Sequence, residues 1–590
     1  MPYIGIDLGT TNSCIVVAHW KEDGAIDKDF LDIKQLKDDN TFYTSKIMPS
    51  CIYIRQDGTQ LVGEGAKELE KKAYKNEKGS RTLRLFKKQM GLLEPFRWKI
   101  DGAEFTPVTA SAIVLKKCGE AYNIYGLTHG RLKYQNTPAT ITCPASFEKS
   151  AKEDTQQAAK QAGFSRDIKM LDEPNAALLS YVYNETQKKL LDLSAKKRFV
   201  TVDLGGGTCD VVVIDVQEET LPNGKKNLVL RQIGSARRGD LGGSDFDKAL
   251  AVIIIKKFLH DNHLTVDPKS EEYVKLVSQA FTVAEEVKEE FSDDLRNQIE
   301  IALVEQEKEE TEELVWEKIK SLPPKHIHIP DLYNGLSVDE DITLEDYLKI
   351  VNHLIYKQVD TYTTVEEKKA NKNIEEIVFD TLADCQCKPE EIDYVFFTGG
   401  MSYFWPLRLA LSKMLHKEIK IADNPLTAVA EGAALYTLFK EAQRHNDTTL
   451  WQVTNEKESL SDAEQQAIRR NKQSVQMRTS IGKTYMLESK DSLPIVLIER
   501  NAEYPTPRTR IKQVFTTNSE RGAIINIFFG TSRYNWDIEL SRSLELTFKK
   551  PKKLKTPFYI EYEIDEAGIP VFYAVFGENE VYQIGGTQHD

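Results

Sequence analysis

The sequence predicts an α/β body of two similar lobes, followed by an all-β sandwich. The main observation is a duplicated strand–turn–strand unit. Residues 3–18 contain YIGI, DLGTTNS and CIVVA, and residues 198–216 repeat the plan with RFVTV, DLGGGTCD and VVVIDV. Both copies place an aspartate, Asp7 or Asp203, at the end of the first strand, before Leu-Gly and a turn of small residues. A repeated unit of this kind indicates two related lobes that face each other across a cleft.

The second observation is a change of pattern late in the chain. Helices are expected at residues 148–163, 245–260, 271–291 and 426–440, and a strand, Gly-rich turn and helix at 389–412. From about residue 477, short apolar segments alternate with turn residues, which predicts a small antiparallel sandwich. We therefore expect a body at 1–440, a polar linker at 441–476 and a β-sandwich at 477–590.

Composition and charge argue against several classes of function. The chain has 590 residues, 41% of them hydrophobic, and a net charge of −13, which is typical of a globular protein. Nucleic-acid binding needs clustered cations, and the basic run at 549–555 (KKPKKLK) is interpreted as a solvated loop. Met1 leads directly into an apolar strand, and no apolar run approaches the ~20 residues of a membrane span. We expect a cytoplasmic protein with no nucleic-acid or membrane partner.

The cysteines and histidines give weak signals for metal binding. The seven cysteines are scattered, and the C-x-C spacing of Cys385 and Cys387 is not usual for zinc ligands, so reduced thiols are expected. His326 and His328 suggest a metal ligand pair. Because no partner ligand lies near them in the sequence, we interpret this pair as structural.

The two turns carry the chemistry of a polyphosphate site. Glycines remove Cβ atoms, so that backbone N–H groups can approach an anion closely. Thr10, Thr11 and Thr208 add hydroxyl donors, and the aspartates of the turns suit Mg²⁺ held through water. A pair of ordinary hairpins is the alternative. Two matching copies and a later Gly399-Gly400 turn favour the phosphate site.

Five ordered motifs resemble one known family. IGIDLGTTNSCIVV and VDLGGGTCDVVVIDV are similar to the phosphate motifs of the actin, hexokinase and heat-shock protein 70 superfamily, and most of all to heat-shock protein 70 chaperones of the DnaK type. TCPASF (142–147), LDEPNAALLSY (171–181) and RGDLGGSDFD (238–247) agree in order. The resemblance covers nearly all of residues 1–440. It implies an actin-like ATPase fold, whose two lobes have duplicated ribonuclease H-like cores, followed by an all-β sandwich domain.

The resemblance implies slow ATP hydrolysis with ATP/ADP, Mg²⁺ and K⁺ as ligands. Lys87, in TLRLFKKQMG, matches the family's catalytic lysine, and a cation there would stabilise charge on the γ-phosphate. Glu173, Asp203 and Asp210 would position the attacking water and the ions, together with Thr208. The expected metal ligands are Asp7, Asp203 and Asp210.

The same resemblance implies two groups of nucleotide-binding residues. One group surrounds the phosphates, and the other forms two walls around the adenosine. The expected residues are Gly9, Thr10, Thr11, Asn12, Gly205, Gly206, Gly207 and Thr208 at the phosphates, and Glu285, Lys288, Ser292, Gly399, Gly400 and Met401 at the adenosine.

Residues for interdomain signalling and peptide binding are also implied. Pro144 would be the family's proline switch, and Lys152 stands where the family has an arginine that relays signals between domains. Lysine keeps the charge but loses the bidentate fork. In the sandwich, SIGKTYM, RIKQVFTT and YEIDEAGI resemble the peptide-binding domain. An extended peptide would dock there by backbone hydrogen bonds, with Met486, Phe515 and Ile524 as pocket residues, although core packing is an equal alternative for each.

The sequence departs from the family pattern in four places. The family's C-terminal helical lid is not recognisable, and a polar segment at 454–474 replaces its short Leu-rich acidic linker. The highly charged stretch at 305–373, in the lobe that contacts exchange factors in the family, matches poorly. The adenosine wall reads GGMSYFW, Leu426 replaces an expected Asp, and Glu289 stands where some members have Arg. We expect these changes to affect how the protein traps peptide, how ATP binding is coupled to peptide binding, and how tightly nucleotide binds.

Three functions are compatible with these features. The first is an ATP-dependent chaperone that binds extended, unfolded peptide clients, with a J-domain co-chaperone and an exchange factor as possible partners. The second is a non-cycling holdase or scaffold that uses nucleotide structurally. The third is a small-molecule kinase, which leaves the β-sandwich unexplained. The retained Lys87, Glu173, Asp203 and Asp210 favour the first.

Overall fold

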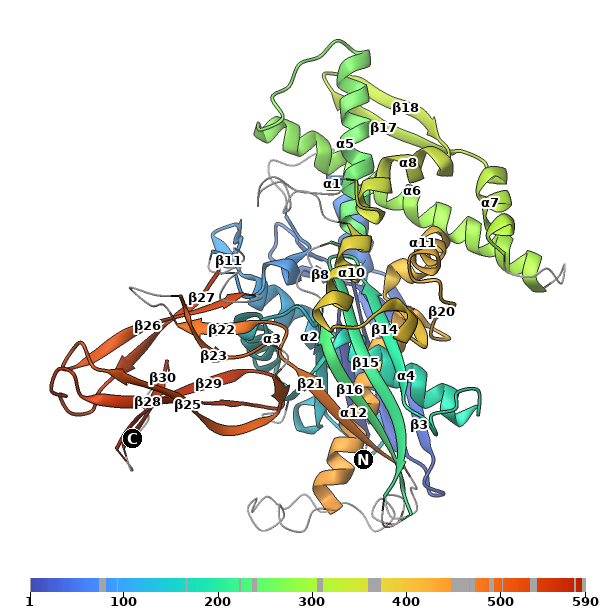
Figure 1. Cartoon of the computed structure of the whole chain (residues 1–590). Helices are drawn as coiled ribbons and strands as arrows, with labels where there is room; N and C mark the ends of the chain where they lie inside the picture. Colours follow the sequence, from blue (N-terminus) through green and yellow to red (C-terminus); the bar gives the residue numbers. More distant parts are fainter. Residues whose placement is uncertain are drawn as a thin grey trace.

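The computed structural model describes most of the chain (Figure 1). The described residues are 2–73, 81–92, 94–164, 168–221, 224–235, 241–304, 311–358, 373–446, 466, 473–487, 493–500, 502–530, 539–577 and 580–585. Most of the expected polar linker, and Arg238, Gly239 and Asp240 of the RGDLGGSDFD motif, therefore lie outside the described residues.

The two copies of the sequence repeat form two sheets with the same strand order and the same pairing directions. The first sheet runs β13-β12-β1-β2-β3, and the second contains β20-β19-β14-β15-β16. In both, the first three strands of the copy pair antiparallel, and two later strands extend the sheet in parallel. The bounds are β1 Tyr3–Leu8, β2 Asn12–Trp20, β3 Ile26–Phe30, β12 Ala139–Cys143 and β13 Ile168–Asp172, then β14 Lys197–Leu204, β15 Cys209–Thr220, β16 Lys226–Ser235, β19 Tyr394–Thr398 and β20 Ile419–Lys420.

Two helices join the sheets into one core. Helices α4 (Glu173–Gln187) and α12 (Pro425–Asn446) pack against each other, and one buried cluster contains side chains of β1, β2, β14, β15 and both helices. The contact is close because glycine leaves room for the backbone. A Cβ on Gly5 would lie 2.1 Å from the Ala434 nitrogen, and one on Gly432 would lie 1.8 Å from the Ala176 oxygen.

The remaining elements surround these sheets. The other helices are α1 Glu64–Ala73, α2 Pro107–Thr128, α3 Lys149–Ala162, α5 Gly243–Asp261, α6 Glu271–Val304, α7 Glu312–Ser321, α8 Leu344–Ile355, α10 Ile374–Asp384 and α11 Trp405–Leu415. The smaller strands are β4 Ile33–Leu36, β5 Phe42–Ser45, β6 Ile47–Pro49, β7 Ile52–Ile54, β8 Gln60–Val62, β9 Thr82–Leu83, β10 Trp98–Ile100 and β11 Ala103–Phe105, with a hairpin of β17 Lys325–Tyr333 and β18 Leu336–Ile342. A helix able to cross a membrane is not found among the described residues.

The C-terminal strands form two four-stranded antiparallel sheets. Their orders are β23-β22-β26-β27 and β25-β28-β29-β30. Side chains from both sheets share one buried cluster that includes Tyr485, Ile527, Ile560 and Phe572. The bounds are β22 Thr484–Leu487, β23 Ile495–Ile498, β25 Thr506–Thr516, β26 Gly522–Gly530, β27 Glu539–Thr547, β28 Pro557–Ile564, β29 Pro570–Phe576 and β30 Glu580–Ile584.

Strand β21 (Gln473–Ser480) joins the two parts of the chain. It pairs in parallel with β16, at the edge of the second lobe's sheet, and β24 (Glu503–Tyr504) pairs with its far end. The expected domain boundary at residue 477 therefore lies inside a strand of the second lobe's sheet. Most residues of the segment QSVQMRTS are polar. Its two large apolar residues, Val475 and Met477, are two positions apart on the strand and both pack against the core between the two lobes.

Candidate functional site

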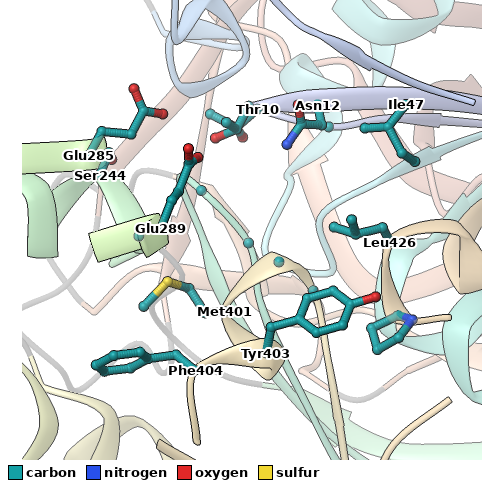
Figure 2. Close-up of a pocket in the computed structure, with 18 of the residues that line it drawn as sticks. Thr10, Asn12, Ile47, Ser244, Glu285, Glu289, Met401, Tyr403, Phe404 and Leu426 are labelled. Atoms are coloured by element: carbon teal, nitrogen blue, oxygen red, sulfur yellow. The ribbon is translucent and has the colours of Figure 1, made fainter. Parts of the chain in front are cut away.

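A cavity of about 450 Å³ lies between the two lobes (Figure 2). Residues from both repeated turns line it, and so does the Gly399-Gly400 turn. Figure 2 shows Thr10 and Asn12 on one side of the cavity and Met401 and Tyr403 on the other. The predicted residues that line it are Asp7, Gly9, Thr10, Thr11, Asn12, Glu173, Asp203, Gly205, Gly206, Thr208, Glu285, Lys288, Ser292, Gly399, Gly400 and Met401.

The two repeated turns touch each other at their glycines. A Cβ on Gly206 would lie 1.6 Å from the Thr11 hydroxyl oxygen, and one on Gly207 would lie 2.6 Å from a Thr10 methyl carbon. Any larger residue would force the turns apart. The first helical turn of α5 also rests here, because the Ser244 N–H donates to the Gly206 carbonyl at 2.8 Å. Backbone and hydroxyl donors of both lobes are thereby concentrated at one end of the cavity, as an anionic ligand requires.

Four carboxylates gather beside these turns. Asp203 and Asp210 are opposite each other on β14 and β15, and Asp7 is the next-to-last residue of β1. Burial, and next the charge of Glu173, raises the pKa of Asp7 and of Asp210 to about 7, and the same causes raise the pKa of Asp203 well above its usual value. Buried carboxylates that repel each other in this way favour a bound cation.

The donor set at this cluster fits Mg²⁺. One oxygen of Asp210 accepts the Ser146 N–H at 2.8 Å, while its other oxygen is buried without a hydrogen-bond partner. Mg²⁺ prefers oxygen ligands and keeps several of its waters. The oxygen atoms of Asp7, Asp203 and Asp210 are therefore compatible with a hydrated magnesium ion.

Lys87 supplies the cation of this cluster. Its ammonium forms a buried ion pair and hydrogen bond with Glu173, at the start of α4. Burial opposes the charged form, but Glu173 and Asp7 raise the pKa of Lys87, so the group is charged at neutral pH. Three expected residues, Lys87, Gly207 and Asp210, lie behind the cavity lining rather than on it.

Long side chains of α6 form one wall at the opposite end. Arg84 donates to both oxygens of Glu285 at 3.1 Å and to Glu70 at 2.9 Å. Burial would raise the pKa of Glu285, yet Arg84 and other nearby cations lower it. The Lys288 ammonium lies 2.6 Å from Asp247. The expected residues Glu285 and Lys288 are therefore held in place by ion pairs.

The facing wall differs from the one expected by resemblance. Tyr403, Phe404 and Leu426 line it together with Met401. The Arg296 guanidinium lies over the Tyr403 ring at 5.0 Å, a cation–π contact that orients this ring. An aromatic ring at this position offers a flat apolar surface to a planar ligand.

Several charged residues in and around the site were not predicted from the sequence. Arg84, Lys88, Asp247 and Arg296 were not singled out, although two of them stand in the TLRLFKKQMG segment that supplied Lys87. The Lys88 ammonium donates to the Ser244 hydroxyl at 2.9 Å and thus links the two lobes across the turns. Its position next to Lys87 could have drawn attention to Lys88. Its partner Ser244, however, is 156 residues away in the sequence, so the contact could not be predicted.

Lys152, one of the two predicted interdomain residues, lies where the sandwich meets the body. Lys152, on α3, is buried and ion-paired with Asp172 at 3.1 Å, and the Tyr504 hydroxyl lies 3.5 Å from the same ammonium. Burial opposes the charge, but Asp172 and Tyr504 raise the pKa of Lys152. Pro144, buried between β12 and α3, accepts a hydrogen bond from the Phe147 N–H at 3.1 Å.

Further polar contacts fasten the sandwich to the two lobes. The Tyr485 hydroxyl donates to Glu148 at 2.8 Å, just before α3. Arg500 reaches the second lobe, where its guanidinium lies 2.6 Å from Asp384 and donates to the Ser235 carbonyl at 2.8 Å. The sandwich therefore contacts both lobes that enclose the cavity.

The three candidate peptide-binding residues are not equivalent in the structure. Met486 is fully buried on β22, but it is not part of the sandwich core cluster to which its neighbours Tyr485 and Leu487 belong. Phe515, on the other sheet, packs against the sandwich core with its ring 5.7 Å from that of Phe558. Ile524 on β26 is 70% exposed and offers an apolar side chain to a partner. Among the described residues, these three side chains therefore do not line a common pocket.

Comparisons with known proteins agree with this arrangement. The sequence model of the Hsp70 protein family matches residues 3–327 and 366–514. The chaperone protein DnaK of Thermosipho melanesiensis is 26% identical over 573 residues, which cover 96% of this chain and 76% of the relative. DnaK of Thermotoga neapolitana is 28% identical over 455 residues, 76% of this chain and 62% of that relative. Because the family match extends over most of its length, the chain belongs to the Hsp70 protein family.

Proposed function

We propose that this protein is an ATP-dependent chaperone with an actin-like ATPase body and a peptide-binding sandwich. The observation that carries this proposal is the cavity between the lobes, where both glycine turns meet and which the carboxylates of Asp7, Glu173 and Asp203 line. The sandwich, in turn, is fastened to both lobes through Lys152, Tyr485 and Arg500. Nucleotide in the cavity and peptide on the sandwich are thus connected through one buried interface.

The residues divide the work of hydrolysis between them. Both glycine turns bind the phosphates through N–H groups and threonine hydroxyls. Asp7, Asp203 and Asp210 would hold magnesium, which would supply positive charge to offset that of the phosphates. Lys87 stabilises the charge that develops on the γ-phosphate. Glu173, fixed by its ion pair with Lys87, orients the attacking water. K⁺ would occupy the same carboxylate cluster.

Peptide clients would bind the sandwich as extended segments. Ile524 is exposed on β26, so the apolar contact of the proposed site centres on this residue rather than on the buried Met486. A J-domain co-chaperone and an exchange factor are the partners that we propose for the cycle, by analogy with the family.

ATP turnover with and without an unfolded peptide tests the proposal. Coupled sites require that peptide changes the rate of turnover, because binding at one site shifts the states that bind the other. A several-fold change supports the chaperone. Turnover that peptide leaves unchanged, or an absence of turnover, favours the non-cycling holdase or scaffold instead. A matched Ile524→Ser variant should bind peptide more weakly while its basal turnover stays unchanged.

Removing the Tyr403 ring should weaken nucleotide binding. If the adenine stacks on this ring, Tyr403→Ala loses ~1–3 kcal/mol, roughly a 5- to 150-fold loss of affinity. Titration calorimetry with ATP measures the effect, and Tyr43→Ala, an exposed tyrosine on β5, is the matched control. Equal affinities of Tyr403→Ala and the control would show that the base lies elsewhere.

A further inference from the structure

The β17–β18 hairpin places two histidines and two aspartates on one exposed face. This hairpin lies beside α5 and α8, away from the sheets that carry the cavity (Figure 1). Its antiparallel register sets His326 opposite Asp341 and His328 opposite Asp339. Residues two apart on a strand point to the same side, so the four side chains form a square on one face.

The opposite face of the hairpin fixes the orientation of this square. Ile327, Ile329 and Val338 alternate with the polar residues and are buried in the core of the second lobe. Glu340, which lies between the two aspartates, also points away from them and pairs with Lys257 of α5. The four residues cannot exchange faces without removing these apolar side chains from the core.

The polar atoms of the square lie at distances that suit metal ligands. His326 Nε2 is 3.3 Å from Asp339 Oδ1, and His328 Nδ1 is 3.6 Å from Asp339 Oδ2. His326, His328 and Asp339 each offer one ligand atom, and these atoms lie within 4.8 Å of one another. Two ligands bound at about 2.0–2.1 Å in a tetrahedron are roughly 3.3 Å apart. Small side-chain rotations on this open surface would therefore complete the coordination.

The geometry points to a binding site for a divalent transition-metal ion, with zinc as its best occupant, at His326, His328 and Asp339. Asp341 lies 2.9 Å from His326 Nδ1, where its carboxylate either orients the ring or provides a fourth ligand. From the sequence, the histidine pair was interpreted as structural because no partner ligand lies near it along the chain. The missing ligands stand 11 to 15 residues later and reach the histidines only through the hairpin register.

The ligand chemistry selects the class of metal. Imidazole nitrogen suits zinc, copper and nickel, whereas magnesium and calcium prefer an all-oxygen shell. All four side chains are more than half exposed, so an ion can enter from solvent without any opening of the fold. None of the four residues lines the cavity between the lobes, so the proposed metal site is distinct from it.

Titration of the full chain with Zn²⁺ alone, followed by calorimetry, tests the site. We expect a high-affinity event that His326→Ala/His328→Ala removes, with affinity falling about 100-fold or more, since even supporting residues of a metal site contribute ~10- to 100-fold. Asp339→Asn should weaken binding in the same direction. Excess Mg²⁺ should not displace the zinc.

His353→Ala provides the matched control, because His353 is an exposed histidine on α8, outside this cluster. Co²⁺ gives a second readout, since a four-coordinate site produces visible absorption that the double variant should lose. The proposal is overturned if the double variant binds Zn²⁺ as tightly as His353→Ala does, or if Asp339→Asn has no effect. Circular dichroism establishes that the surface variants fold.

Discussion

Lys87→Ala should reduce ATP turnover by about 100-fold or more, the usual effect of removing one group that stabilises transition-state charge. Lys87 is the buried cation that reaches the carboxylate cluster, and its partner Glu173 lines the cavity. The variant loses both the charge near the γ-phosphate and the ion pair that orients Glu173. Steady-state phosphate release measures the change.

Nucleotide affinity separates this effect from a general loss of structure. The two glycine turns remain in Lys87→Ala, so ATP should still bind, and turnover should fall much more than affinity does. Lys99→Ala, at an exposed position on β10, is the matched control and should keep the rate of the unmodified protein. If Lys87→Ala hydrolysed ATP at the rate of Lys99→Ala, the proposed role of Lys87 would be wrong.

Lys152→Ala should destabilise the protein by about 3–5 kcal/mol, the usual cost of leaving one member of a buried ion pair alone. Its ammonium is the cation paired with Asp172, and both side chains are almost fully buried between α3, β13 and the sandwich. The shift of the urea unfolding midpoint measures the loss. The same variant should also loosen the contact of Tyr504 with the body, which hydrogen exchange around β24 would report.

Two further variants define what this result means. Lys160→Ala, an exposed lysine on the same helix, should change stability by no more than about 0.5 kcal/mol. Lys152→Met/Asp172→Leu removes both charges and should recover much of the lost stability, because a buried pair can often be replaced by apolar side chains. A Lys152→Ala protein as stable as Lys160→Ala would contradict the account of this interface.

Much of the site followed from the sequence because its residues lie in short local motifs. The turns after Asp7 and Asp203 are rich in glycine, which permits a close backbone approach, and the structure brings Gly206 against Thr11. The duplication predicted two related lobes, and the two sheets share one strand order. Local patterns of this kind can be recognised in the sequence without knowledge of the tertiary fold.

The features that the sequence did not reveal depend on long-range pairing. Arg84 donates hydrogen bonds to Glu285, which is 201 residues away in the sequence. His328 lies opposite Asp339 only because of the register in which the β17–β18 hairpin pairs. The expected boundary between the polar linker and the sandwich divided strand β21, whose residues 473–476 were assigned to the linker, because only alternate residues of this strand are apolar. Met486 was a pocket candidate by resemblance, but the local sequence does not show that its side chain is fully buried.

The release of a labelled, unfolded peptide in the presence of ATP or ADP tests the central claim most directly. The buried contacts of Lys152, Tyr485 and Arg500 connect the sandwich to both lobes around the cavity. We predict that ATP changes the release rate several-fold relative to ADP, and that Lys152→Ala reduces this difference. Equal release rates in ATP and ADP would contradict the claim that nucleotide controls how tightly the sandwich holds a peptide.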